Sequence, residues 1–334
     1  MSILVTGGAG YIGSHVVVEL LNKGEKVVIL DNFCNSERST ADRIRQITNK
    51  NVLDYLVDIT DARAVDRIFA LHGFECVIHF AALKAVGESV QNPFAYYHNN
   101  VAGMLVLLKA MQKYNVKQLV FSSSATVYGI QDSNPIYETA DRSAISPYGQ
   151  TKIMCENIIS DLAKADPKFS AISLRYFNPV GAHSSYLIGE NPKGAPNNLM
   201  PIIANVATKK TQKMSVYGND YDTFDGTCIR DYIHVVDLAV GHIHALEYIR
   251  CHKGMTSVNL GTGSGVSVLQ AIETFESVND VRVPYDVIDR RKGDSAVLVA
   301  NVDKAKHILN WQAKIDFNTM CRDQYGWATR CNKV

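Results

Sequence analysis

The stretch Ile3–His15 constrains the fold more than any other part of the chain. It opens with apolar residues that are typical of a short buried strand, and from Tyr11 onward apolar residues recur at helical spacing. Between the two, Gly7, Gly10 and Gly13 repeat at every third position. A glycine-rich turn between a strand and a helix lets a pyrophosphate approach the backbone and face the helix N-terminus. The stretch therefore predicts a phosphate cradle.

An acidic residue extends this prediction to a dinucleotide. The second predicted strand, residues 26–30, runs into Asp31, which follows the glycine repeat at the spacing of a dinucleotide-binding fingerprint. A carboxylate there is placed to bind the adenosine ribose hydroxyls, and it would repel a 2′-phosphate. We therefore expect NAD rather than NADP. Arg38, which could favour NADP, lies beyond the loop that follows Asp31.

The first half of the chain alternates strands and helices. Apolar runs typical of strands at 52–57, 76–80 and 118–121 are separated by helical patterns at 62–71 and 101–114. This alternation predicts an α/β fold, a Rossmann-like doubly wound parallel sheet with helices on both faces. Ligands of such sheets bind at the carboxyl ends of the strands, so the polar residues that follow the strands should share one crevice.

Composition limits the classes of partner. The 334 residues carry a formal net charge of +1 without a long basic run, so we expect no nucleic acid as a partner. No apolar run reaches membrane-spanning length, and because the first predicted strand begins at Ile3, we expect no signal peptide. The seven cysteines are widely spaced without a C-x-x-C pair, which indicates neither a metal site nor a disulfide framework. A cytoplasmic protein with reduced thiols is expected.

A candidate catalytic set follows the fifth predicted strand. Ser124 ends a serine-rich strand terminus, and Tyr148 and Lys152 stand four residues apart on a predicted helix, so they share one face of it. Such a Tyr-Lys pair often arises by chance, but here it accompanies a dinucleotide motif. We expect the Lys152 ammonium and the positive nicotinamide ring to favour the phenolate of Tyr148, which would act as a general base near neutral pH. Ser124 would hydrogen-bond the reacting oxygen.

The glycine repeat and this Ser-Tyr-Lys set resemble the extended short-chain dehydrogenase/reductase superfamily. Four longer strings resemble its UDP-glucose 4-epimerase family (UDP-hexose 4-epimerases): residues 121–129, 174–181, 196–201 and 230–234. The resemblance runs from Ile3 to about Trp311. The sequence departs from the family pattern at scattered positions, for example at Cys228, where the family usually has glycine.

The resemblance implies tightly bound NAD and the residues that contact it. These residues comprise the glycine cradle, the loop after Asp31 on the adenosine side, and a run on the nicotinamide side. The implied cofactor-binding residues are Gly7, Gly10, Tyr11, Ile12, Gly13, Asp31, Asn32, Phe33, Cys34, Asn35, Ser36, Asp58, Ile59, Phe80, Ala81, Ala82, Leu83, Lys84, Asn99, Ser124, Tyr148, Lys152 and Phe177.

The second half of the chain is less regular. Residues 181–201 are typical of a long loop, which in a compact enzyme is usually functional. The basic cluster at 290–294 would by itself be read as a solvated turn, but arginine forks suit diphosphate oxygens. The resemblance implies that Arg230 and Arg291 together hold the UDP diphosphate. The implied substrate-binding residues are Ser124, Tyr148, Asn178, Asn198, Leu199, Tyr217, Arg230, Arg291, Asp294 and Leu298.

The length favours two lobes. We expect an NAD-binding Rossmann-like lobe at 1–177 and a smaller, interleaved C-terminal lobe at 178–334 that binds the UDP-sugar substrate. Segments around 230–262 are expected to return to the first lobe. The helices that begin near Val101 and Tyr148 carry more apolar surface than one side of a sheet needs, and related enzymes pair through a four-helix contact, so we expect a homodimer.

The reaction that the resemblance implies is inversion at C4 of a UDP-hexose, between UDP-glucose and UDP-galactose, through a transient 4-keto sugar. A nucleotide-sugar dehydratase shares the first step, but dehydratases carry an Asp-Glu pair where this chain has Ala125-Thr126. A net oxidoreductase that releases its cofactor each turnover stays open on motifs alone. An NAD-binding redox regulator without chemistry would not need the Ser-Tyr-Lys set.

Leu298 bears on substrate range. The resemblance places it on the wall that faces the sugar 2-position, where members confined to glucose and galactose commonly carry Tyr and members that accept N-acetyl sugars a smaller residue. A leucine lies between these cases in size. We therefore expect measurable conversion of UDP-N-acetylglucosamine and UDP-N-acetylgalactosamine as well. The alternative is that Leu298 is a core leucine and another residue sets the size limit.

Overall fold

The centre of the molecule is a parallel sheet, seen here in a computed structural model that describes residues 1–131, 133–194, 196–291 and 293–331. Its seven strands are β1 (Ser2–Thr6), β2 (Val27–Asp31), β3 (Leu53–Leu56), β4 (Phe74–His79), β5 (Gln118–Ser124), β6 (Ser170–Tyr176) and β11 (Gly254–Leu260). They are ordered β11-β6-β5-β4-β1-β2-β3. The order reverses after β1, as in doubly wound folds, so the predicted fold class is confirmed.

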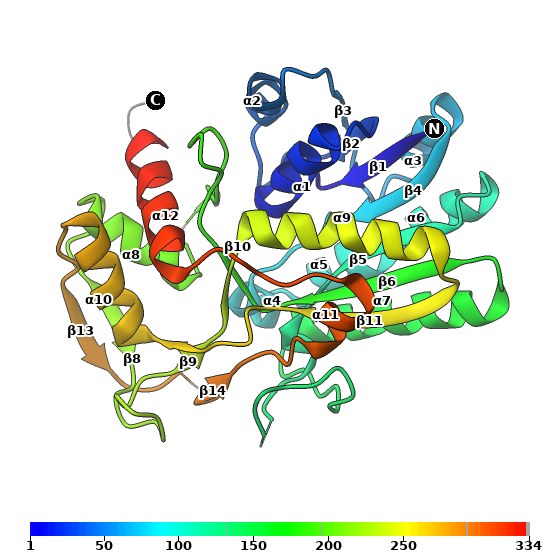
Figure 1. Cartoon of the computed structure of the whole chain (residues 1–334). Coiled ribbons are helices and arrows are strands. Elements are labelled where there is room, and N and C mark those ends of the chain that lie inside the picture. Colours follow the sequence, from blue (N-terminus) through cyan, green and yellow to red (C-terminus); the bar gives the residue numbers. More distant parts are fainter. Residues whose placement is uncertain (132, 195, 292, 332–334) are drawn as a thin grey trace.

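Helices cover both faces of this sheet (Figure 1). One face carries α1 (Tyr11–Asn22), α2 (Ser39–Thr48), α9 (Val235–Cys251) and α11 (Asp303–Leu309). The other carries α3 (Ala62–Leu71), α6 (Gly103–Lys113) and α7 (Pro147–Ala165). Strand residues alternate between the two cores: Ile3 and Val5 pack on the α1 side, and Leu4 packs on the α6 side. Burial on both sides explains why the central strands β1 and β2 are almost continuously apolar.

A smaller lobe lies at the carboxyl ends of the strands, on the left of Figure 1. It contains α8 (Leu199–Ala207), β8 (Met214–Tyr217), α10 (Val268–Asn279), β13 (Tyr285–Ile288) and α12 (Phe317–Cys331). Its own apolar core joins Met200 and Ile203 of α8 to Phe275 of α10 and Met320 of α12. Strands β8 and β13 pair in parallel. We call this the second lobe and the sheet with its helices the first lobe.

Short strands connect the lobes. β7 (Asn178–Val180) pairs with β10 (Tyr232–His234), and β9 (Ile229–Arg230) lies between β12 (Val266–Ser267) and β14 (Val297–Leu298). From β10 the chain enters α9 of the first lobe, continues into β11 beside β6, and then returns to α10 of the second lobe. The connections therefore bring residues from distant parts of the sequence to the end of the central sheet.

Three elements differ from the sequence-based expectations. The helix predicted at 101–114 extends further toward the N-terminus, because α6 continues from a π-helix (Tyr97–Ala102) and from α5 (Pro93–Tyr96). The separate short helix α4 (Val86–Gln91) precedes them. π-Helical turns are rare and occur often at functional sites. The sequence pattern does not predict strand β6, because Ser173 and Arg175 interrupt its apolar run, although both residues are buried. The loop expected to end at residue 201 ends in α8, which starts at Leu199.

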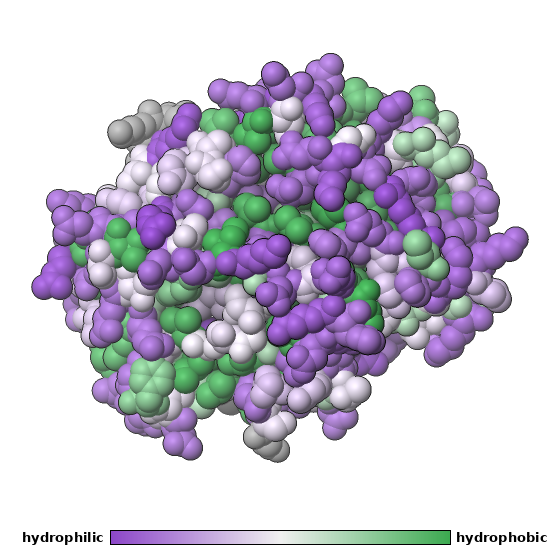
Figure 2. Space-filling view, in the orientation of Figure 1, coloured by the Kyte–Doolittle hydropathy of each residue, from purple (hydrophilic) through white to green (hydrophobic). Residues whose placement is uncertain are grey.

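Hydrophilic side chains cover most of the face shown in Figure 2, with hydrophobic patches between them. Across the described ranges no helix is long and apolar enough to cross a membrane.

Candidate active site

The predicted phosphate cradle forms at the end of β1. Gly7 has a φ of +70°, which side chains rarely adopt, and a Cβ on Gly13 would lie 2.2 Å from the Gly7 carbonyl oxygen. Glycine is therefore required at both positions. Helix α1 starts at Tyr11 without a side-chain cap on its N-terminus. The amide groups of its first turn face the pocket, where they can bind a phosphate.

Asp31 is fixed at the end of β2. Its Oδ2 accepts a hydrogen bond from the Ala9 amide at 3.0 Å, and its Oδ1 accepts from the Phe33 amide at 2.8 Å and from Ser36 Oγ at 2.9 Å. An ionised carboxylate has about four acceptor positions, so capacity for ribose hydroxyls remains. The cradle and this carboxylate fit a dinucleotide without a 2′-phosphate.

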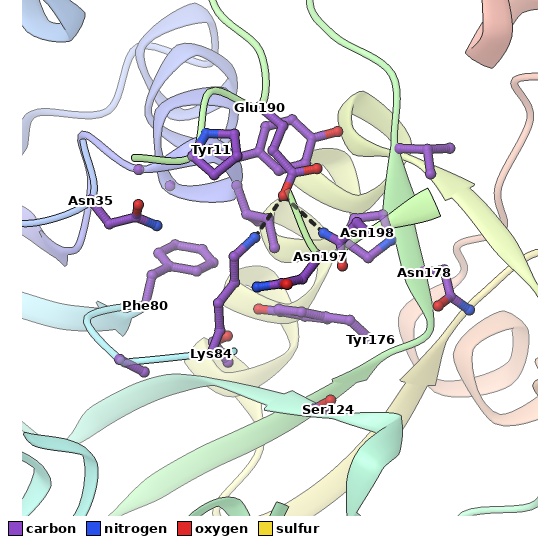
Figure 3. A pocket seen from close by; sticks show the side chains of 18 of the residues that line it. Tyr11, Asn35, Phe80, Lys84, Ser124, Tyr176, Asn178, Glu190, Asn197 and Asn198 are labelled. Carbon is purple, nitrogen blue, oxygen red and sulfur yellow. Dashed lines mark hydrogen bonds and ion pairs between the residues drawn. The ribbon is translucent and has the colours of Figure 1, made fainter. Parts of the chain in front are cut away.

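The predicted site residues come together in one large pocket between the lobes. With two exceptions, every residue predicted to bind cofactor or substrate lines it. The exceptions are Phe33, whose buried ring lies 5.2 Å from the Arg38 guanidinium, and Asp58, which accepts a 2.8 Å hydrogen bond from Asn32. Both lie just behind the lining on the adenosine side. Figure 3 shows how side chains from both lobes point into this pocket.

Ser124, Tyr148 and Lys152 meet where β5 ends and α7 begins. Ser146 caps α7 by accepting a hydrogen bond from the Gly149 amide at 3.2 Å, and Pro147 occupies the first turn. Both features favour a helix start here. The Lys152 ammonium donates a 2.6 Å hydrogen bond to the carbonyl of Ser122, and this lysine is 3% exposed. The helix thus presents the phenol and the ammonium to the same end of the sheet.

The Ser124 hydroxyl oxygen accepts hydrogen bonds from the Thr126 amide at 3.2 Å and from the Thr126 hydroxyl at 3.0 Å. Because its acceptor sites are used in this way, its own proton is available for a ligand oxygen. Thr126 occupies a position where a dehydratase would carry an acid, and here it orients the serine instead.

The second lobe supplies the basic side of the pocket. The Arg291 guanidinium stacks on the Tyr217 ring at 3.8 Å, and Arg230 of β9 lies 3.6 Å from the Asp294 carboxylate. Because the flat face of the guanidinium lies on the ring, the N–H donors of Arg291 point outward in its plane, where they can bind a diphosphate. Lys292, from the same basic cluster, lies outside the described residues.

Comparisons with known proteins identify the family of this chain. A family model described as GDP-mannose 4,6 dehydratase matches residues 4–324. The chain is 54% identical to the UDP-glucose 4-epimerase of Bacillus subtilis, covering 98% of this chain and 96% of that protein. It is 53% identical to the enzyme of Haemophilus influenzae, covering 98% and 97%. The chain belongs to the UDP-glucose 4-epimerase family.

Solved structures of this family superimpose closely. The UDP-glucose 4-epimerase of Stenotrophomonas maltophila, solved with NAD and formylated UDP-arabinopyranose, has a TM-score of 0.98 at 48% identity and covers 100% of this chain and 99% of its own. The enzyme of Bifidobacterium longum, solved with NAD+ and UDP, has a TM-score of 0.95 at 47% identity, covering 99% and 98%.

Burial controls the protonation of the two catalytic candidates. It raises the pKa of Tyr148 to about 12, against a smaller opposite effect of Ser124. Burial also lowers the pKa of Lys152 to about 8, while Cys155 and Glu156 act in the opposite direction. Burial therefore opposes ionisation of the phenol, and the expected phenolate depends on the two positive charges named from the sequence, Lys152 and the nicotinamide ring. The oxidised nicotinamide ring of NAD carries the second of these charges.

A buried ion pair holds α7 against the sheet behind this set. The Glu156 carboxylate, one turn beyond Lys152, accepts from the Arg175 guanidinium at 2.9 and 2.7 Å and from Ser123 Oγ at 2.6 Å. Arg175 lies on β6 and Ser123 on β5, so the pair fixes the helix relative to both strands. Within the described parts of the chain, no three His, Cys, Asp or Glu side chains gather as a metal site.

Sequence reasoning missed two residues that organise the site. Asn100, in the π-helix, exchanges hydrogen bonds with the backbone of Leu83 at 2.8 and 3.0 Å and donates to the Thr151 hydroxyl at 3.0 Å. It thereby joins the predicted nicotinamide run to α7. The second is Glu190, a buried acid in the pocket wall. Their only sequence signals were a second asparagine after Asn99 and a carboxylate within the long loop.

Proposed function

We propose that this chain interconverts UDP-glucose and UDP-galactose through a transient 4-keto sugar, with NAD held throughout. One observation carries the proposal: a single pocket joins the Ser-Tyr-Lys set to a phosphate cradle on one side and to the arginines of the second lobe on the other. The names of the relatives, at about half identity over nearly the whole chain, support the same reaction.

The geometry suits proton transfer at the sugar 4-hydroxyl. Tyr148 takes the proton of this hydroxyl as a general base, and Ser124 donates a hydrogen bond to the same oxygen. NAD, when bound, accepts a hydride from C4 and later returns it. Lys152 stays protonated at neutral pH, because its pKa of about 8 lies above 7, and its charge favours the phenolate. After the keto sugar has rotated in the pocket, the hydride returns to the opposite face of C4 and Tyr148 gives the proton back to the 4-oxygen.

The pocket is suited to hold UDP firmly and the hexose loosely. Arg230 and Arg291 supply positive charge on the expected diphosphate side, where forked donors match phosphate oxygens. Near the reacting end the wall includes the apolar Phe177 and Leu298. Apolar contacts are not directional, so they allow the keto sugar to present either face.

The rival reaction is a net oxidation in which cofactor leaves at each turnover. To separate the two, the purified protein is extracted for NAD and NADH, and UDP-glucose is followed by proton NMR without added cofactor. Bound NAD(H) near one equivalent and growth of the UDP-galactose signal support the proposal. An empty protein that needs stoichiometric NAD and accumulates an oxidised sugar supports the oxidoreductase.

We also propose that UDP-N-acetylglucosamine and UDP-N-acetylgalactosamine are interconverted. Leu298 lies in β14, paired in register with Arg230 of β9, and its side chain lines the pocket. An acetamido group requires room in this wall that a tyrosine would fill. Relatives of this fold include the UDP-Glc/GlcNAc 4-epimerase of Campylobacter jejuni, at 34% identity and a TM-score of 0.87.

A second copy of this chain is the partner that we propose. Large apolar side chains are exposed on neighbouring helices α4–α7: Val90 is 61% exposed, Phe94 85%, Leu105 43% and Met154 36%. Burying them between two copies would remove apolar surface from water. Sedimentation at micromolar concentration tests this: a homodimer is expected, and a monomer contradicts it.

The division at 177/178 and the cytoplasmic location are proposals as well. Asn178 opens β7 toward the second lobe, just after β6 of the central sheet ends. Cys34, Cys76, Cys155, Cys228, Cys251 and Cys321 are unpaired, which is typical of a reducing compartment. Limited proteolysis and compartment-specific tagging test these two points.

A further inference from the structure

Residues Gly189–Lys193, which we call the strap, lie along the pocket on the second-lobe side. Glu190, Asn191 and Pro192 of the strap line the pocket. A bridge between Ala182 and Gly189 closes the base of this loop, and the indole of Trp327 in α12 donates a 2.9 Å hydrogen bond to the Glu190 carbonyl. The strap is thus anchored in the second lobe.

The far end of the strap is attached to the first lobe, at the loop that follows β2. The Lys193 amide donates to Asn35 Oδ1 at 3.1 Å, and its ammonium donates to the Phe33 carbonyl at 2.6 Å. Asn191 Nδ2 donates to Glu37 Oε1 at 2.8 Å. This loop is the predicted adenosine side of the cofactor pocket. The strap therefore connects the two lobes over the place where the cofactor is expected.

Glu190 is the centre of the strap. Its Oε1 accepts a hydrogen bond from the Lys84 ammonium at 2.8 Å and another from Asn198 Nδ2 at 2.8 Å, as Figure 3 shows. Lys84 belongs to the predicted nicotinamide run, and Asn198 precedes α8 in the predicted sugar-nucleotide site. One carboxylate oxygen thus joins the two halves of the pocket.

The burial of Glu190 is not explained by packing. Its side chain is only 5% exposed, and its Oε2 is buried without a hydrogen-bond partner. Leaving a carboxylate oxygen unpaired in a protein interior is costly. Lys84 compensates the charge of Glu190 through Oε1, but it leaves Oε2 unpaired. The free oxygen can accept a hydrogen bond from a ligand hydroxyl, which would offset this cost.

We propose that Glu190 is a positioning residue that holds the strap closed over NAD, so that the cofactor is retained between the two hydride transfers. This rests on the proposed function, in which NAD is used and regenerated without leaving. Because Glu190 also binds Asn198, a bound sugar nucleotide and bound NAD stabilise the same closed strap. By linkage, UDP then slows the loss of NAD.

The test measures NAD retention rather than turnover. Parent and variants are loaded with NAD and desalted, and the NAD that remains is released by acid and quantified over time, with and without UDP. Glu190→Gln removes the charge but keeps an acceptor, Glu190→Ala removes both, and Lys193→Met breaks the adenosine end of the strap. Glu25→Gln is the matched control, because it breaks a 2.9 Å ion pair with Arg250 in the first lobe, away from the pocket.

We expect NAD loss to be about tenfold faster or more in Glu190→Ala, since hydrogen bonds to charged groups contribute strongly. Glu190→Gln should be intermediate, Lys193→Met should also be faster, and the control should match the parent. Saturating NAD should restore turnover in all three strap variants. UDP should slow the loss in the parent and much less in Glu190→Ala.

Equal loss rates in the parent, Glu190→Ala and Lys193→Met would overturn the proposal, as would an equal acceleration in Glu25→Gln. Turnover that saturating NAD cannot restore would place Glu190 in the chemistry instead and overturn it too. If Glu190→Ala does not fold, Lys193→Met decides, because its side chain lies at the rim. A parent that holds NAD but makes no UDP-galactose contradicts the proposed function alone, since retention is measured without turnover.

Discussion

The ammonium of Lys152 lies 5.8 Å from the centroid of the Tyr148 ring. The two side chains project from successive turns of α7, and a hydrogen bond from Lys152 to the Ser122 carbonyl fixes the ammonium at the end of β5. Burial opposes ionisation of the phenol, and this fixed charge favours it. The chemistry of the site depends on which effect prevails once the cofactor is present.

Replacing Tyr148 by Phe removes the proposed base and keeps the ring, which packs edge-on to Tyr96 at 6.5 Å between centroids. Turnover should fall by about a hundredfold or more, the usual scale for losing general-base catalysis. Bound NAD should be unchanged by extraction. Turnover close to that of the parent would reject Tyr148 as the base.

Changing Lys152 to Met keeps the stem and removes the charge. Burial already raises the pKa of Tyr148, and without the fixed cation the phenol of the NAD-bound enzyme should ionise at higher pH than in the parent. The activity profile should shift toward alkaline pH, as measured by turnover between pH 6 and about 10. A profile of unchanged shape, merely scaled down, would show that Lys152 only positions the ribose.

Local patterns predicted the sheet, the cradle and the Ser-Tyr-Lys set, because these depend on spacing within strands, turns and one helix. Gly13 is an example, because the Gly7 carbonyl that excludes a side chain at this position belongs to the same glycine-rich turn. Glu190 could not be found in this way. Its partners Lys84 and Asn198 come from different lobes, and only the folded chain brings the three together.

The effect of burial on the pKa of Tyr148 also could not be predicted from the sequence. Residue spacing shows that Lys152 is near, but the loss of solvent around the phenol depends on the whole pocket wall. Asn100 illustrates the same limit, because its hydrogen bonds to Leu83 and Thr151 exist only when the π-helix packs against α7.

Leu298→Tyr tests the substrate range. Filling the wall with a phenol should leave UDP-glucose and UDP-galactose turnover within a few-fold and suppress N-acetyl turnover by about tenfold or more, given the roughly 1–3 kcal/mol cost of overpacking. Both sugar pairs are compared in parent and variant. If the parent converts no N-acetyl sugar, or the ratio does not change, another residue sets the size limit.

Three buried histidines make stability depend on pH. Burial lowers the pKa of His15 and His79 to about 3 and that of His242 to about 4. Below the unfolded value of about 6.5 the unfolded chain binds protons that the folded chain does not, so stability falls as pH decreases. Each histidine contributes up to roughly 1.4 kcal/mol per pH unit in this range.

The urea midpoint of unfolding, measured at about pH 7.5, 6 and 5, should therefore decrease steadily below pH 6.5. His79→Gln removes one of the three groups and should make the decrease smaller. A midpoint that does not change between pH 7.5 and 5 would contradict the protonation states assigned to these histidines.

Isotope transfer distinguishes transient oxidation with retained NAD from a net oxidation. UDP-glucose carrying deuterium at C4 is incubated with the purified protein in ordinary water without added cofactor, and the product is analysed by NMR and mass spectrometry. We expect UDP-galactose that keeps deuterium at C4, because the same hydride leaves and returns within one closed site. UDP-galactose that has lost the label, or a released keto sugar with an equivalent of free NADH, would contradict it.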